Sequence, residues 1–197
     1  MVTRATTHPL IREVGHSGGP VVFDDIQVAL SSAKVPASNA PTWRVHDFGI
    51  AAGVTFSVLG FAIGDYIDFY IQTSHSMKLN TILEDHLHGT LPSNDAGKKI
   101  KWQLDAIAAG IGEAWAVVPG SPFTREMTLT GSEAGKHNYI DIADMPAVNT
   151  TVSTVYICRM TRISASSDDY PNEVYLIYND AHYQKDTVGS LQETSKV

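Results

Sequence analysis

Apolar and polar side chains tend to alternate in several short segments of this chain, and this alternation constrains the fold more than any other feature. The clearest case is IGDYIDFYIQ at residues 63–72. One face of this segment would carry Ile63, Ile67, Phe69 and Ile71, and the other Tyr66, Asp68, Tyr70 and Gln72. A period of two residues is typical of a β-strand with one buried face, and β-branched and aromatic residues favour strands.

Similar segments recur through the rest of the chain, separated by turn-rich stretches such as GSEAG, ADMPAVN and SASSDDYPN. The segments are MKLNTILEDHLH, MTLT, HNYIDI, VSTVYICRMTRI and EVYLIYNDAHYQ. Many short strands joined by such turns are typical of sandwiches and barrels. We therefore predict an all-β protein, a jelly-roll-like antiparallel β-sandwich over residues 43–188.

Residues 96–116 fit two interpretations. As a strand, the segment would place Ile100, Trp102, Leu104 and Ala106 on one face; as a helix, it would align Ile100, Leu104, Ile107, Ile111 and Trp115. Gly110 and Gly112 would each weaken a helix by about 1 kcal/mol. We predict a strand, with the helix as the alternative.

The first 42 residues differ in composition from the rest. The stretches GHSGGP and SSAKVPASNAP are rich in Gly, Pro, Ser and Asn, which favours loops. Between them, VVFDDIQVAL could form one short strand or a helical turn. We predict an extended N-terminal arm at residues 1–42, laid over another surface, and a short C-terminal tail at residues 189–197.

The charge balance excludes one class of partner. The chain has 14 Lys and Arg against 21 Asp and Glu, which gives a net charge of −7. An acidic protein does not offer a broad basic surface to nucleic acid or to an anionic membrane. No apolar run reaches the ~18 residues of a membrane helix, and the N-terminus lacks the apolar stretch of a secretory signal. We expect no nucleic-acid or membrane partner, and synthesis in a cytoplasm.

A single cysteine, Cys158, rules out an internal disulfide and a cysteine-based zinc cluster. It lies in the middle of the predicted strand VYICRM, where a buried structural thiol is the usual case. The chain also lacks a Gly-x-Ser-x-Gly elbow and a complete phosphate-binding loop. We therefore predict no catalytic residue and no cofactor.

Three histidines lie within residues 75–88 and form the one candidate metal site. If this segment is a strand, His86 and His88 share a polar face with Glu84, and their Cα atoms stand about 7 Å apart. Two such imidazoles can share one metal ion. We predict His86 and His88 as ligands, with His75 or His182 as a possible third.

Three interpretations of these histidines stay open. They could form local hydrogen bonds or face solvent. In a homotrimer with this strand at the axis, three pairs would supply six nitrogens for an octahedral ion. In a cupin-like enzyme they would hold a catalytic metal, but Pro92 and Ser93 stand where such an enzyme has a nearby glutamate.

Several short motifs resemble a group of structural proteins from tailed bacteriophages. That group has Gln-x-x-His, then His-x-His, then a closing strand with His-Tyr-Gln and a Gly-Ser-x-Gln-Glu tail. The corresponding residues here are Gln72, His75, His86, His88, His182, Tyr183, Gln184, Gly189, Ser190, Gln192 and Glu193. The resemblance covers residues 43–194, and Gly89 departs from it, since an aromatic residue commonly stands at that position.

The resemblance implies a virion protein without catalytic activity. It implies a homotrimeric cement or decoration protein on the exterior of the capsid, made in the host cytoplasm, whose N-terminal arm binds the major capsid protein or other virion proteins. The alternative within the same group is a fibre, collar or tail protein that contacts a host receptor or glycan. Exposed aromatic residues such as Tyr66 and Tyr70 could then stack on sugars.

Overall fold

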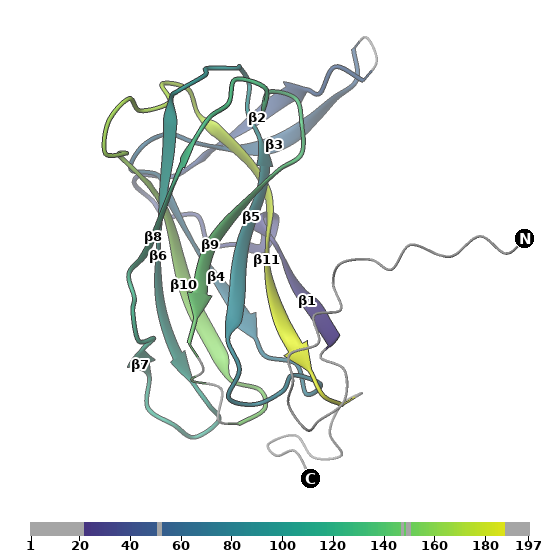
Figure 1. The fold of residues 1–197 in the computed structure, drawn as a ribbon, viewed down its shortest axis with the longest axis vertical. Coiled ribbons are helices and arrows are strands. Elements are labelled where there is room, and N and C mark those ends of the chain that lie inside the picture. Colours follow the sequence, from purple (N-terminus) through teal and green to yellow (C-terminus); the bar gives the residue numbers. More distant parts are fainter. Residues whose placement is uncertain (1–21, 51–52, 147, 149–150, 188–197) are drawn as a thin grey trace, which may run out of the picture.

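The computed structural model describes residues 22–50, 53–146, 148 and 151–187, which form two antiparallel β-sheets (Figure 1). The larger sheet contains β1 (Val22–Ala29), β2 (Thr42–Asp47), β3 (Thr55–Phe61), β5 (Leu83–Thr90), β9 (Asn138–Met145) and β11 (Val174–Lys185). The smaller sheet contains β4 (Tyr66–Gln72), β6 (Lys99–Ala109), β7 (Ala116–Val117), β8 (Phe123–Thr128) and β10 (Val155–Ile163). Among the described residues, no helix has the length and hydropathy to cross a membrane.

The order of the strands is that of a jelly roll. The larger sheet runs β2-β3-β11-β5-β9, with β1 also paired to β11. The smaller sheet runs β4-β10-β6, and both β7 and β8 pair with the free side of β6. The chain repeatedly passes from one sheet to the other, so that strands distant in sequence become neighbours. The predicted all-β sandwich is confirmed.

The core lies between the two sheets and follows the predicted alternation. In β6, the side chains of Ile100, Trp102 and Leu104 are almost completely buried. The rings of Trp102 and Phe61 meet edge to face, with centroids 5.4 Å apart, and join the two sheets. Because β6 pairs with β10 on one side and with β8 on the other, the helical alternative for this segment is wrong. Cys158 lies buried in β10, as expected.

The strand predicted from Met77 onward begins only at Leu83. Asn80 has a φ of +60°, a left-handed conformation that interrupts an extended chain. Met77 is nevertheless fully buried and forms an isolated bridge with Lys185 of β11. The apolar side chains at the start of this segment therefore belong to a turn that packs on the core.

The second half of the predicted arm belongs to the sandwich. β1 pairs with β11 from Val22 opposite Lys185 to Ala29 opposite Tyr178. Since β3 covers only the first three residues of β11, the rest of that edge would have unpaired backbone groups without β1. The boundary predicted at residue 42 is therefore wrong. Residues 1–21 of the arm and the tail at 189–197 lie outside the described residues.

After β1 the chain crosses to the other sheet. Val28 and Leu30 lie in the core, and Lys34 forms a bridge with Asp68 of β4, in which each backbone N–H donates to the other's carbonyl. Deleting residues 1–40 should therefore lower the melting temperature by many degrees, since it removes a strand and two core side chains. Deleting residues 1–21 is the control, and equal melting temperatures for the two truncations would contradict this role of β1.

A second prediction concerns two arginines of β10. Arg162 is 2 % exposed and donates to the carbonyl oxygens of Phe61, Tyr170 and Asn172 at 2.6–2.8 Å. Arg162→Met leaves these acceptors without donors and should cost about 3 kcal/mol in the free energy of unfolding. The control is Arg159→Met, whose exposed ion pair with Asp68 contributes at most about 1 kcal/mol. Equal losses in urea titrations would refute the distinction.

Candidate functional site

Histidine, tyrosine and acidic side chains gather on the outer face of the larger sheet, which we call the histidine face. The strand register explains the grouping: His88 lies opposite Tyr178 and Tyr139, and Glu84 lies opposite His182. The members are Asp25 in β1, Glu84, His86 and His88 in β5, His137 just before β9, Tyr139 and Asp141 in β9, and Tyr178, Asp180 and His182 in β11. The strands β5, β9 and β11, which are far apart in sequence, thus contribute alternate residues to one surface, and β1 adds Asp25.

Asp180 is the acidic centre of this face and is 3 % exposed. Its Oδ1 lies 3.0 Å from Nε2 of His88 and 3.7 Å from Nδ1 of His86. Its Oδ2 lies 3.3 Å from Nε2 of His182, which is also 3.2 Å from Oδ1 of Asp25. One carboxylate therefore holds imidazoles from two strands together. Of these contacts to Asp180, the one from His88 is a hydrogen bond, and a bond to an ionised carboxylate belongs to the stronger class.

Neighbouring rings cover the two histidines of the His-x-His motif. Tyr178 stacks on His88 with centroids 4.3 Å apart and planes at 10°, and Tyr139 lies 4.8 Å from His86. His86 and His88 are consequently only 4 % and 9 % exposed, although they share the outer face as predicted. Burial, followed by the like charge of His182, lowers the pKa of His86. The neutral imidazole is the form that can bind a metal ion.

The structure places the possible metal ligands in groups that differ from the predicted pair. Ligand atoms of Glu84, His86 and His182 all lie within 4.8 Å of one another, and those of Asp25, Asp180 and His182 form a second such group. His88 belongs to neither group. His75 lies in the connection between β4 and β5, where its Nε2 is 2.8 Å from Oγ of Ser153. Of the two possible third ligands, the fold brings His182 to the pair and leaves His75 elsewhere.

Sequence reasoning placed Glu84 beside the histidines but missed Asp25 and Asp180 as their partners. Asp180 and His182 alternate in DAHYQ as residues on one side of a strand must, which was the available signal. Asp25 stood in the segment assigned to the arm, so nothing local linked it to His182. The pairing of β1, β11 and β5 decides these contacts.

Directly behind the histidine face, a buried pair lies on the core side of the same strands. Asp85 is fully buried, and its Oδ2 accepts a hydrogen bond of 3.0 Å from Nδ2 of Asn179. The same amide donates to the carbonyl of His86 at 2.8 Å. Burial raises the pKa of Asp85 to about 8, against the lowering effect of Asn179. The carboxyl group is therefore neutral at pH 7.

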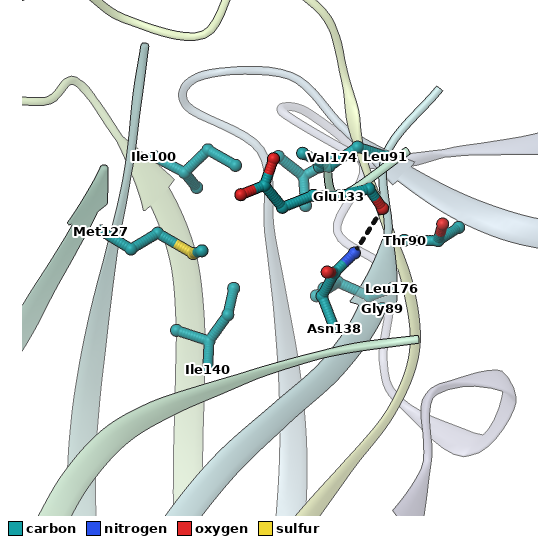
Figure 2. A pocket seen from close by; sticks show the side chains of 10 residues that line it. All are labelled: Gly89, Thr90, Leu91, Ile100, Met127, Glu133, Asn138, Ile140, Val174 and Leu176. Carbon is teal, nitrogen blue, oxygen red and sulfur yellow. Dashed lines mark hydrogen bonds between the residues drawn. The ribbon is translucent and has the colours of Figure 1, made fainter. Parts of the chain in front are cut away.

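A small cavity of about 10 Å³ lies between the sheets near the end of β5, which is about the room that one water molecule needs (Figure 2). Asn138 donates from Nδ2 to the backbone carbonyl of Glu133 at 2.8 Å beside it. Burial opposes ionisation of Glu133, but hydrogen bonds from Thr130 and Ser132 lower its pKa to about 2. This carboxylate therefore anchors the loop before β9.

A broader hollow lies at the surface beside Arg44, Pro92 and Tyr175. Neither this hollow nor the small cavity is lined by a member of the histidine face, within the described parts of the chain. The cupin-like enzyme, whose metal would need room for a substrate beside it, stays a prediction. The trimer-axis metal also stays a prediction.

Several solved structures resemble this chain, including a viral chain and TmCBM61. No protein-family model and no curated protein matches the chain. A chain of infectious bursal disease virus, Gx strain, is 12% identical with a TM-score of 0.39; the match covers 100% of this chain and 41% of the viral chain. TmCBM61, solved in complex with β-1,4-galactotriose, is 10% identical with a TM-score of 0.25; the match covers 81% of this chain and 94% of TmCBM61. At these TM-scores the assignment of the fold rests on the strand order.

The raised pKa of Asp85 predicts a specific pH dependence of stability. The folded state keeps a proton on this carboxyl up to about pH 8, whereas the unfolded chain loses it near pH 3.8. Between pH 3.8 and about pH 8, unfolding therefore releases a proton from Asp85. As pH rises through this range, this group should lower the free energy of unfolding by about 1.4 kcal/mol per pH unit. Asp85→Asn should remove that slope in urea titrations from pH 4.5 to 7.5. Asp144→Asn, at an exposed position of β9, is the control and should keep it. An unchanged slope in Asp85→Asn would refute the assignment.

Proposed function

We propose that this chain is a non-enzymatic structural component of a tailed-phage virion, a homotrimeric cement or decoration protein on the capsid exterior. The observation that carries the proposal is the hairpin of β2 and β3, which extends beyond the sandwich (Figure 1). β2 pairs only with β3 among the described strands. Such an element is available to a neighbouring subunit.

The hairpin exposes large apolar side chains on both of its faces. Trp43 and Val45, which are 55% and 73% exposed, point to one side, and Phe56, 53% exposed, points to the other. Ile50 and Val54 near its tip are also exposed. Clusters of exposed apolar and aromatic residues mark surfaces that bind other proteins. We infer that virion subunits, either copies of this chain or the major capsid protein, cover this hairpin.

Two further observations support a structural role. The jelly roll recurs in viral capsid proteins, although it also serves lectins and cupins, so that the fold alone does not decide function. The motifs shared with tailed-phage structural proteins supply the more specific argument. Of these, the His-x-His pair and the His-Tyr-Gln segment lie on paired strands, β5 and β11.

The alternative, a fibre or tail protein that contacts host glycans, finds less support at the predicted aromatic residues. The guanidinium carbon of Arg159 lies 4.3 Å from the centroid of Tyr66, and the ammonium of Lys34 lies 5.0 Å from that of Tyr70. These cations occupy ring faces on which a sugar would stack. Cell-adhesion assays with the isolated protein test this alternative directly.

The proposal is tested with purified protein and phage particles lacking it. We expect a trimer by light scattering, binding to the particles, and a higher temperature at which the particles burst. A monomer that does not bind particles would refute the structural assignment.

Hairpin variants connect this function to the structure. Trp43→Ser combined with Val45→Asp should weaken trimer formation or particle binding about 30-fold or more, since buried aromatic anchors at interfaces contribute about 2 kcal/mol or more. The control is Trp115→Ser, which removes a similarly exposed tryptophan from the connection between β6 and β7. Assembly that is unchanged in the hairpin double variant would show that another surface mediates it.

A further inference from the structure

We propose that Glu84, His86 and His182 bind one divalent transition-metal ion, of the zinc and cobalt type, on the histidine face. The inference rests on side-chain geometry alone and does not depend on the proposed virion role. The proposed ligands come from two strands, β5 and β11, whereas the predicted pair, His86 and His88, lies on β5 alone.

The pairing of β5 with β11 brings the three ligands together. Glu84 of β5 lies directly opposite His182 of β11, and His86 follows two residues later on the same face of β5. The ligand atoms lie within 4.8 Å of one another, and the rings of His86 and His182 meet at a centroid distance of 4.3 Å. In a tetrahedral zinc site with bonds of about 2.1 Å, ligand atoms stand roughly 3.4 Å apart. Small side-chain rotations therefore suffice.

The donor set suits a borderline cation. Two imidazoles and one carboxylate are the protein ligands of many zinc sites, and the same set serves other divalent transition metals. Glu84 and His182 are partly exposed, so an ion can enter from solvent. Asp25 and Asp180 flank Nε2 of His182 at 3.2 and 3.3 Å, where they can orient the ring and add negative charge.

A second, independent observation concerns His86. Its side chain is almost completely buried, yet its Nδ1 has no hydrogen-bond partner among the described residues. The carboxylate of Asp180, at 3.7 Å, is too far for a hydrogen bond. An unpaired buried nitrogen is costly unless another group satisfies it. A cation bound between Glu84, His86 and His182 would supply the buried imidazole of His86 with a partner.

His88 is excluded as a ligand because both of its ring nitrogens are engaged. Its Nε2 lies 3.0 Å from Oδ1 of Asp180, and its Nδ1 lies 2.8 Å from Nε2 of His137. His88 would have to break one of these contacts to bind an ion, whereas His86 breaks none. The geometry therefore separates two histidines that are equivalent in the sequence pattern.

The test is a titration of the full-length chain with Co²⁺, after treatment with a chelator and its removal, followed by visible absorption and by competition with Zn²⁺. We expect one ion per chain and a rise in the melting temperature with either metal. Glu84→Gln and His182→Ala should each weaken binding at least about 30-fold. His137→Ala, an exposed histidine of the same face, is the matched control and should change affinity less than about 3-fold.

Several outcomes would overturn the inference. These are failure of the wild-type chain to bind either ion, binding that survives both Glu84→Gln and His182→Ala, and binding lost in His137→Ala but kept in those variants. Thermal unfolding without metal checks that the variants are folded. If His182→Ala does not fold, Glu84→Gln, a nearly isosteric change at a partly exposed position, decides the result. Particle binding is measured separately, so loss of the metal site leaves the proposed function intact.

Discussion

The two-sided pairing of β11 is the constraint on which the rest of the structure depends. β5 covers one side of this strand, while β3 and β1 cover successive parts of the other. Because buried backbone groups must be paired, β1 at residues 22–29 is held in the sheet although most of its side chains are not buried. This same pairing brings Asp25, Asp180 and His182 next to the histidines of β5.

Alternation along β5 gives adjacent residues opposite environments. Asp85 points into the core, where burial keeps its carboxyl neutral, while His86 points outward into a group of acids and imidazoles. A register irregularity between these two residues, where β5 pairs with β9, accompanies the change. The strand therefore carries a buried acid on one side and a candidate cation site on the other.

The hairpin proposed for assembly and the proposed metal site lie along different parts of β11. β3 pairs with β11 at Val174–Leu176, whereas the histidine face lies where β1 pairs, at Tyr178–Lys185. A metal ion there would link β5 to β11 without covering the hairpin. Assembly and metal binding can thus be tested one at a time, and neither result determines the other.

The sequence by itself determined the strand type of most segments, because the two-residue alternation of Ile100, Trp102 and Leu104 is a local property of the backbone. For the same reason it placed His86 and His88 on one face. Only the tertiary structure decided that His182 and Glu84, and not His88, complete the group with His86, and that residues 22–29 form a strand. Strand pairing joins residues far apart in the chain, and short alternating segments do not encode which partner or register each strand takes.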